Sequence, residues 1–290
     1  LALAEAYRNK KTEIEADGSQ TIQRLTRMNI LPDSISQITS KSFDEAFNQL
    51  SSRFDMNYGG FSGAPKFPSS MNLAFLLRYY LRAGQTSARN FVELSLTKMA
   101  TGGMYDQLGG GFHRYSVDER WLVPHFEKML YDNAQIIDFL SSLMSLEPSP
   151  LYKDRIEKTF SWLDKEMIFT KSNYCAYFSA IDADSEGVEG LYYVWDYSEI
   201  LDELGDDGRE FALQYGAKKE GNWEEKNILN RIGRDSSDDC RYEISAKNKA
   251  RLSRLLSRRK LRVLPSIDNK ILTVAIGALA EPTSYPNFFA

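Results

Sequence analysis

The sequence predicts a mainly α-helical fold in which two-helix units stack side by side and close into an (α/α) toroid. Apolar residues recur at helical spacing in several segments, and a loop motif occurs twice, 51 residues apart. Units of about 50 residues, each with two helices and a glycine-rich loop, are typical of stacked helical hairpins whose loops gather at one mouth. The alternative is an irregular α-rich domain in which the motif recurs by chance. The two copies read Phe54-Asp55-x-x-x-Gly59-Gly60-Phe61 and Tyr105-Asp106-x-x-x-Gly110-Gly111-Phe112.

The composition is that of a globular protein with a sizeable core. Of the 290 residues, 42% are hydrophobic and 26% are charged, and the net charge is −4. Nucleic-acid and anionic-membrane surfaces need clustered Lys and Arg, but the basic cluster Arg251 to Arg262 is matched by acidic segments such as Asp202 to Glu210. We therefore interpret this cluster as a solvated helix face and expect no nucleic acid as a partner. No apolar run approaches the ~20 residues of a membrane span, so no membrane is expected either.

Two cysteines without a CxxC pair indicate a reducing compartment, and no signal peptide is visible, so we expect a cytoplasmic location. The same spacing suggests neither a metal knuckle nor a redox dithiol. No metal and no cofactor are therefore predicted.

The N-terminal segment, residues 1–41, reads as a helix and a linker from the end of a preceding domain. Pro32 opens a stretch rich in Ser and Asp, and Ser42 with Glu45 has the spacing of a capping box. The toroid domain is therefore expected at residues 42–290. Because the chain does not begin with Met and ends abruptly at Ala290, we expect a piece of a longer protein with an incomplete ring.

Further helices follow in chain order, separated by glycine, proline and polar loops. Gly84 ends one helix, and Pro124 occupies a first helical position, where proline is accepted. Residues 174–178 and 191–195 favour strands on either side of an acidic turn, which predicts short β-hairpins in the loops. The helices are expected at about 70–82, 87–99, 124–144, 151–169, 197–215 and 246–258.

The stretch from Thr101 to Leu146 holds both histidines of the chain beside a glycine run. If the helix begins at Pro124, His125 is its second residue, and the amide dipoles there disfavour imidazolium and favour a carboxylate. His125 is then neutral near pH 7, as suits a general base, and Glu127 is ionised. The alternative is structural: His125 and Glu127 cap a helix, and His113 is a hydrogen-bonded loop histidine.

A second acidic site is Asp182-Ala-Asp184-Ser-Glu186-Gly187. It begins like a calcium loop, but Tyr193 stands where a bidentate Glu is required, so we exclude an EF-hand. Paired carboxylates at the mouth of a cleft fit acid–base work on a glycosidic bond or hydrogen bonds to sugar hydroxyls. A capped, solvated turn is the alternative.

Several of these segments resemble the thioredoxin-domain-containing proteins of the spermatogenesis-associated protein 20-like family. The resemblance covers about Ser42 to Thr273, and its central block is long and specific. The segments are Gly59-Gly60-Phe61, Ala64 to Pro68, Tyr105-Asp106-Gln107, Gly109 to Asp118, Val123 to Gln135, Asp182 to Ser185, Glu189-Gly190, Val194-Trp195, Asn227-Ile228-Leu229 and Asp268 to Thr273.

The resemblance implies a thioredoxin-like domain followed by an (α/α)6 toroid similar to six-hairpin glycosidases and N-acylglucosamine 2-epimerases, with no established activity. The thioredoxin-like domain and its cysteine motif are missing from these residues, so no redox role is assigned. The family continues after Thr273 with a Trp-Asn-Gly stretch, whereas Val274-Ala275-Ile276 follows here. The resemblance therefore defines the fold better than it defines the function.

Two hypotheses for function remain. The first is a carbohydrate-active toroid, a sugar hydrolase or 2-epimerase with a saccharide ligand. The second is a non-catalytic sugar-binding or scaffold module attached to the thioredoxin-like domain. An open pocket lined by polar groups favours the first, and buried, mutually hydrogen-bonded groups favour the second. The catalytic candidates are His113, His125, Glu127, Asp106, Asp182 and Asp184, and the substrate-binding candidates are Lys66, Phe67, Arg114, Tyr115, Trp121, Tyr131 and Trp195.

Overall fold

The computed structural model describes residues 2–29, 38–61, 63–171, 174–233 and 245–272. The chain divides into two units, Leu1–Asp44 and Glu45–Ala290. The first contains α1 (Ala2–Asn9) and α2 (Lys11–Asn29). The expected boundary after residue 41 lies within α3 (Ser40–Ser51), which begins two residues before the predicted cap. Each helix in the described part of the chain is too short or too polar to span a bilayer.

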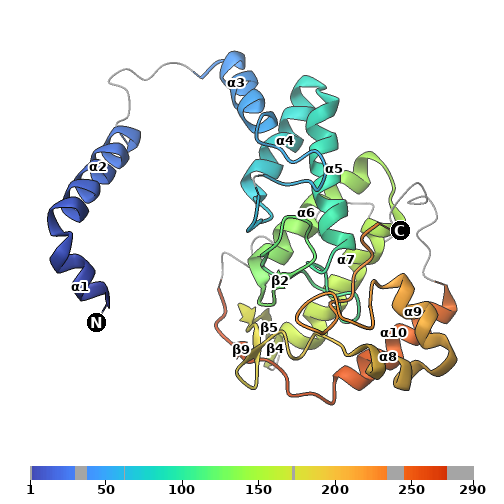
Figure 1. Ribbon diagram of the computed structural model, residues 1–290. Coiled ribbons are helices and arrows are strands. Elements are labelled where there is room, and N and C mark those ends of the chain that lie inside the picture. Colours follow the sequence, from blue (N-terminus) through green and yellow to red (C-terminus); the bar gives the residue numbers. More distant parts are fainter. Residues whose placement is uncertain (1, 30–37, 62, 172–173, 234–244, 273–290) are drawn as a thin grey trace. The chain divides into compact units, whose positions relative to one another are not determined.

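The second unit is built from helical hairpins, as the sequence predicts (Figure 1). Helices α4 (Ser70–Ala83) and α5 (Thr86–Thr101) pack together across a two-residue turn, where Gly84 ends α4 with φ 68°. Helices α6 (Leu130–Leu146) and α7 (Pro150–Trp162) form the next pair. Ser149 caps α7 by accepting a hydrogen bond from the backbone N–H of Tyr152. The prediction of a mainly α hairpin fold is confirmed.

A third group of helices follows a long connection. The single helix expected at 197–215 is two helices, α8 (Tyr197–Leu204) and α9 (Gly208–Gln214), because Gly205 adopts φ 60° and ends α8. The 3-10 turn Gly205–Asp207 joins them. Helix α10 (Ala246–Arg259) packs on α8, and the two share an apolar core with Trp195 and Leu108.

The long connections after α3, α5 and α7 pair with one another through Lys66–Ser116 and Lys128–Ile181, and they carry short strands. The strand expected at 174–178 is confirmed, but the one expected at 191–195 is wrong. Gly190 has φ 74° and its carbonyl oxygen accepts the N–H groups of Tyr193 and Val194, so a turn forms there instead. A π-helical turn, Leu163–Met167, ends α7 earlier than expected. The strands are β1 (Tyr115–Ser116), β2 (Pro124–His125), β3 (Lys128–Met129), β4 (Ile168–Lys171), β5 (Tyr174–Tyr177), β6 (Ala180–Ile181), β7 (Asp184–Ser185), β8 (Val188–Glu189) and β9 (Ile267–Asp268).

The helix expected from Pro124 is wrong at its start. Pro124 and His125 form β2, which pairs with β1 in the register Tyr115↔His125, and α6 begins only at Leu130. Buried and half-buried residues alternate from Pro124 to Leu130, which is the period of a strand. His125 is therefore not in the first turn of a helix, and the dipole argument for its charge does not apply.

The two copies of the repeat fold alike. In each, an aromatic residue pairs with the phenylalanine of the Gly-Gly-Phe motif across an isolated bridge, Phe54↔Phe61 and Tyr105↔Phe112. The second glycine of each motif, Gly60 or Gly111, has positive φ, and a side chain at either position would clash with a tryptophan ring. The nearest ring atom would lie 2.8 Å from a Cβ at Gly60 and 2.7 Å from one at Gly111.

A lysine closes each loop in the same way. Lys66 donates hydrogen bonds to the Asp55 carboxylate and to the Gly59 carbonyl oxygen. Lys128 donates to the Asp106 carboxylate at 2.8 Å and to the Gly110 carbonyl oxygen at 2.7 Å. The repeat is therefore a structural unit with a buried lysine–aspartate pair.

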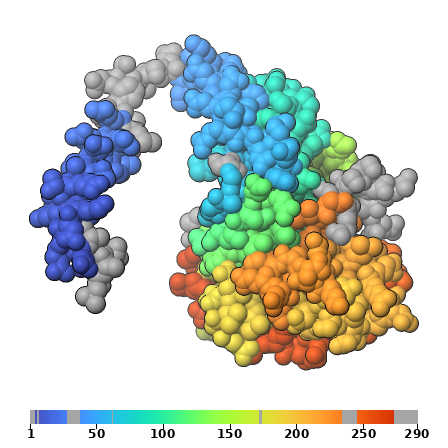
Figure 2. Space-filling view, in the orientation of Figure 1, coloured from blue at the N-terminus to red at the C-terminus, as the bar shows by residue number. Residues whose placement is uncertain are grey.

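The closing lysines also link one unit to the next. The backbone of Lys66 pairs with Ser116, and that of Lys128 pairs with Ile181. Residues Phe178 to Tyr192 are also aromatic, acidic and glycine-containing before a helix, which is a weaker third echo of the motif. They have a different structure, with β6 followed by the β7–β8 hairpin. In Figure 2, the orange surface of the α8–α10 region borders the green surface of the second loop. An ion pair between Asp106 and Arg259 joins these regions.

Candidate functional site

The expected site residues fall into two environments. Five of them lie in the interior: Lys66, Asp106, His113, Trp121 and Trp195. The remaining eight are half-buried or exposed, with Tyr131 at the start of α6 and the others on the long connections: Phe67, Arg114, Tyr115, His125, Glu127, Tyr131, Asp182 and Asp184.

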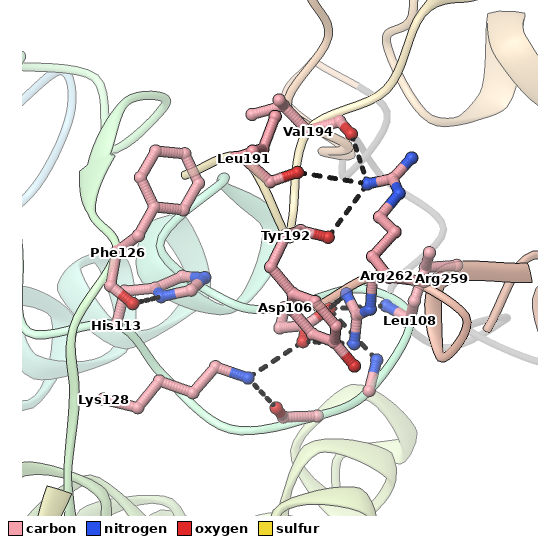
Figure 3. A network of polar contacts seen from close by, with 12 residues as sticks. Asp106, Leu108, His113, Phe126, Lys128, Leu191, Tyr192, Val194, Arg259 and Arg262 are labelled. Carbon is pink, nitrogen blue, oxygen red and sulfur yellow. Dashed lines mark hydrogen bonds and ion pairs between the residues drawn. The ribbon is translucent and has the colours of Figure 1, made fainter. Parts of the chain in front are cut away.

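Asp106 lies at the centre of a buried ionic network (Figure 3). Both terminal nitrogens of Arg259 donate to its two carboxylate oxygens at 2.8 Å, and Lys128 donates from the other side. Burial alone would raise the pKa of Asp106, but the positive charges of Arg259 and Lys128 hold it well below its usual range. Asp106 is therefore a permanent anion whose oxygens are occupied by partners.

His113 is buried beside this network, with 2% of its surface exposed. Its Nδ1–H donates to the carbonyl oxygen of Phe126 at 2.9 Å, and its ring meets Phe126 and Tyr193 edge to face. Burial, with the nearby charge of Lys128, lowers the pKa of His113 to about 3. The ring is therefore neutral near pH 7.

The cavity beside His113 and Asp106 has a volume of only about 20 Å³. This is room for about one water molecule, whereas ligand pockets are typically about 300–1,000 Å³. The inner group of residues therefore has the buried, mutually bonded arrangement that favours a structural role.

The other interior candidates also have structural partners. The indole N–H of Trp121 donates to the carbonyl oxygen of Tyr58 at 2.8 Å. The guanidinium of Arg262 covers the ring of Trp195, with its carbon 4.3 Å from the ring centre. The structure therefore brings neither tryptophan to a surface where a ligand could stack on it.

An aromatic strip lies on the half-exposed side of the loops. The pairing of β1 with β2 places Tyr115 opposite His125, and their rings stack with centres 5.0 Å apart. Phe67, which follows the closing lysine of the first loop, stacks on Tyr115 at 4.6 Å and is 49% exposed. Three ring systems from two repeat units thus form one continuous strip.

His125 at the end of this strip is held by a carboxylate. Its Nδ1 lies 2.6 Å from Oε1 of Glu189, which β8 supplies, and the same oxygen accepts the backbone N–H of Phe126 at 3.3 Å. In the neutral ring Nδ1 then carries the proton, and Nε2 is left with a lone pair. Nε2 lies 3.8 Å from a carboxylate oxygen of Glu127. A histidine oriented by a carboxylate in this way is suited to proton transfer.

Arg114 extends the cluster from His125 to the start of α6. It donates to Glu127 at 2.9 Å and also hydrogen-bonds the Tyr131 side chain. The next residue, Asp132, is 9% exposed, and within the described part of the chain its Oδ2 has no hydrogen-bond partner. Burial raises the pKa of Asp132 to about 7; Arg114 opposes this shift and Glu127 adds to it.

The acidic turn contributes one residue to the neighbourhood of this cluster. Asp184 on β7 lies opposite Glu189 on β8, and directly paired residues of antiparallel strands project on the same side. Asp182 is exposed and accepts hydrogen bonds from the backbone N–H groups of Ala183 and Asp184, as in a capped turn. No cluster of three or more metal-binding side chains occurs among residues 2–272 wherever the structure describes them.

Four important residues are missing from the expected set: Glu189, Asp132, Lys128 and Arg259. Lys128 could have been found from the repeat, because a lysine follows both Gly-Gly-Phe motifs. Arg259 was not predicted, because its helix was interpreted as a solvated basic face. This interpretation is wrong for Arg251 and Arg259, because both are buried. Arg251 pairs with Asp207 and Glu210, so the expected balance with the acidic segment is confirmed.

The long connections between the helical hairpins carry short strands and a half-exposed histidine–carboxylate cluster. Stacked hairpins connected in this way define a toroid-type helical protein. The chain is 30% identical to rat spermatogenesis-associated protein 20 over 316 aligned positions, covering 94% of this chain and 39% of the rat protein. It is 36% identical to the human protein of that name over 208 positions, covering 66% and 26%. The chain belongs to the spermatogenesis-associated protein 20-like family. It spans about two fifths of the length of the rat relative and about a quarter of the length of the human one.

No family model matches the chain. Solved structures similar to it include a sugar epimerase from a ruminal bacterium, with 18% identity, a TM-score of 0.40, and coverage of 49% of this chain and 40% of that one. A family 76 glycoside hydrolase from a bovine Bacteroides thetaiotaomicron strain has 18% identity, a TM-score of 0.42, and coverage of 51% and 32%. A D-mannose isomerase has 13% identity, a TM-score of 0.40, and coverage of 54% and 43%. Similarities of this size identify no residue role.

Proposed function

We propose that the half-exposed cluster around His125 binds a carbohydrate and carries out acid–base chemistry on it. The observation that carries this proposal is the aromatic strip Phe67–Tyr115–His125, which ends at a histidine held 2.6 Å from Glu189. An exposed aromatic face beside a proton-transfer group supplies both binding surface and chemistry.

Binding follows from the two kinds of surface in the cluster. Sugar rings have apolar C–H faces that pack on exposed aromatic rings such as Phe67, and their hydroxyl groups need charged or polar partners. Arg114 and Glu127 offer donors and an acceptor next to the strip. The 3.8 Å between His125 and Glu127 leaves these two groups without a direct bond, so both have capacity for a ligand.

Two reactions fit this set of groups. In a 2-epimerase, Nε2 of His125 would take a proton from the carbon next to a carbonyl group, with Glu189 stabilising the imidazolium that forms. In a hydrolase, one carboxyl group would protonate the leaving oxygen and a second would assist water or form a covalent intermediate. Asp184, opposite Glu189, and Glu127 are the carboxylates that the loops place near His125.

The second candidate function is a scaffold, and the network of Asp106 favours it. This network is buried, occupies both oxygens of Asp106 and joins α10 to the second loop, so it accounts for Asp106 and Lys128 without any ligand. In this function the loops present a surface to a partner, such as the thioredoxin-like domain that the resemblance implies, in the cytoplasm. The two candidate functions differ at His125, whose partners are half-exposed. Turnover of a saccharide requires this residue, whereas a scaffold does not.

The test uses the full-length protein and a panel of saccharides, including D-mannose and cellobiose, with thermal unfolding and turnover as readouts. We expect a binding saccharide to raise the Tm of wild type, and His125→Ala to keep binding while losing turnover. Phe67→Ala should lose binding. Phe169→Ala, which removes a 36% exposed aromatic ring from β4, is the matched control and should behave as wild type. No Tm shift and no turnover with any saccharide would overturn the proposal.

A further inference from the structure

Asp132 has an environment that its role as a helix residue does not explain. It lies in the first turn of α6, one position after Tyr131, and nine-tenths of it is buried. Its Oδ2 has no hydrogen-bond partner in the described part of the chain, although buried carboxylates normally have one. An ionised oxygen left in this state would be strongly destabilising, whereas a protonated carboxyl is tolerated.

The titratable groups that face Asp132 come from three segments. Arg114 leads into β1 and Glu127 lies between β2 and β3, whereas the third, Tyr131, precedes Asp132 on α6 and is neutral because its pKa is raised. Arg114 is the one cation among them, and its guanidinium is already bound to Glu127 and to Tyr131. An ionised Asp132 would therefore compete with Glu127 for the same guanidinium.

We propose that Asp132 is a positioning residue of the carbohydrate site, acting through Arg114. While its carboxyl carries a proton, Arg114 remains bound to Glu127 and both are aligned beside His125. When the proton leaves, the new buried anion attracts Arg114 and loosens it from Glu127. This inference rests on the proposed carbohydrate function, because its consequence is a pH-dependent affinity of that site.

The direction of the effect follows from the protonation equilibrium. Burial raises the pKa of Asp132 to about 7, so the carboxyl is mostly protonated at pH 6 and mostly ionised at pH 8. The protonated fraction changes about tenfold between these pH values, and an affinity that depends on it changes by up to the same factor. Saccharide binding should therefore be tighter at pH 6.

The first experiment needs no ligand. The carboxyl ¹³C resonance of Asp132 in the full-length protein, assigned by its loss in Asp132→Asn, is followed from pH 4 to pH 9. We expect its midpoint near pH 7. A midpoint below pH 5 would overturn the proposal, because the carboxyl would then be ionised throughout the working range.

The second experiment measures binding of D-mannose and cellobiose at pH 6 and pH 8 by calorimetry. Wild type should bind up to about tenfold more tightly at pH 6, and Asp132→Asn should bind equally at both pH values, at the tighter affinity. Asp132→Glu should restore a pH dependence. Asp138→Asn, on the same helix, is the matched control and should keep the wild-type dependence. A dependence that persists in Asp132→Asn would overturn the role of Asp132.

The two experiments separate this inference from the proposed function. If no saccharide binds to any variant while the midpoint of Asp132 lies near pH 7, the carbohydrate function fails and the buried acid stands. If a saccharide binds with no pH dependence in wild type, the carbohydrate function stands and the positioning role fails.

Discussion

The two copies of the glycine loop have the same closure but different surroundings. In the first, Lys66 pairs with Asp55, whose side chain is 19% exposed. In the second, Lys128 pairs with Asp106, whose side chain is 4% exposed and also accepts two hydrogen bonds from Arg259. The repeated motif therefore encodes a structural closure, and the second copy has been buried more deeply and joined to α10.

The connection between motif and lysine also differs. Lys66 follows Phe61 by five residues, whereas Lys128 follows Phe112 by sixteen, so the second connection is eleven residues longer. The first copy shows that a short connection is enough for closure. The added length of the second holds β1, β2 and the half-exposed groups Arg114, Tyr115, His125 and Glu127. Residues that closure does not require are the better candidates for function.

The largest expected effect is on the stability of the second closure. Asp106→Asn leaves two buried cations, Arg259 and Lys128, without their anion and should cost about 3–5 kcal/mol of unfolding free energy. Asp55→Asn, the matched change in the more exposed copy, should cost about 1–3 kcal/mol. Urea unfolding of both variants measures the difference. Equal costs would show that the extra burial and Arg259 add nothing.

The next prediction concerns a feature that both copies share. Gly60→Ala and Gly111→Ala each place a Cβ at positive φ and against a tryptophan ring. The backbone strain is about 1–2 kcal/mol and overpacking typically adds about 1–3 kcal/mol, so each variant should lose about 2–5 kcal/mol. The two losses should agree to within about 1 kcal/mol. A large inequality would mean that the loops are not equivalent structural units.

The third prediction compares two buried groups that respond to pH in opposite directions, His113 in the second loop and Asp132 in the first turn of α6. The unfolded chain protonates His113 at its ordinary value near 6.5, but the folded protein only near pH 3, so this group lowers stability as pH falls from 7 to 5. Asp132 acts in the opposite direction, because its folded pKa of about 7 exceeds its ordinary value near 3.8. Each contribution is about 2 kcal/mol over this interval.

Wild-type stability should therefore change little from pH 7 to pH 5, because the two contributions oppose each other. Asp132→Asn removes one of them, so this variant should lose about 2 kcal/mol over the same interval. Denaturant unfolding at pH 5, 6 and 7 measures both proteins. A variant as insensitive to pH as wild type would contradict the raised pKa of Asp132.

The parts of the fold that the sequence predicted are those with a local cause. The hairpins α4/α5 and α6/α7 follow from apolar spacing and, at the end of α4, from the cap at Gly84. The start of α6 was misplaced because Pro124 at a first helical position and apolar residues at helical spacing also fit a short strand pair. Strand β2 forms only because β1 lies beside it. The partner of His125 is Tyr115, 10 residues away, so the sequence around Pro124 carries no signal of the pairing.

The site was predicted less completely, because half of its partners are distant in the sequence. His125, Glu127 and Arg114 lie in one stretch, and their types alone indicated chemistry. Glu189 is 64 residues from His125, and Arg259 is 153 from Asp106, so only the folded chain brings them together. Burial was the other missing quantity. It separates Asp106 and His113 from His125, although all three looked alike as candidates.

The smallest expected effect on stability is at the His125–Glu189 pair, where function should respond most. Glu189→Gln keeps the shape of the side chain, which is 44% exposed, and should change the unfolding free energy by less than about 1 kcal/mol. The variant loses the charge that stabilises an imidazolium at His125, so turnover of a saccharide substrate should fall about 10²-fold or more. Lys66→Met, in the first loop, should show the reverse pattern of lower stability with turnover kept in the folded fraction. If Glu189→Gln instead unfolds the protein as readily as Asp106→Asn does, the half-exposed cluster is a second structural closure, and the extra length of the second loop serves the fold alone.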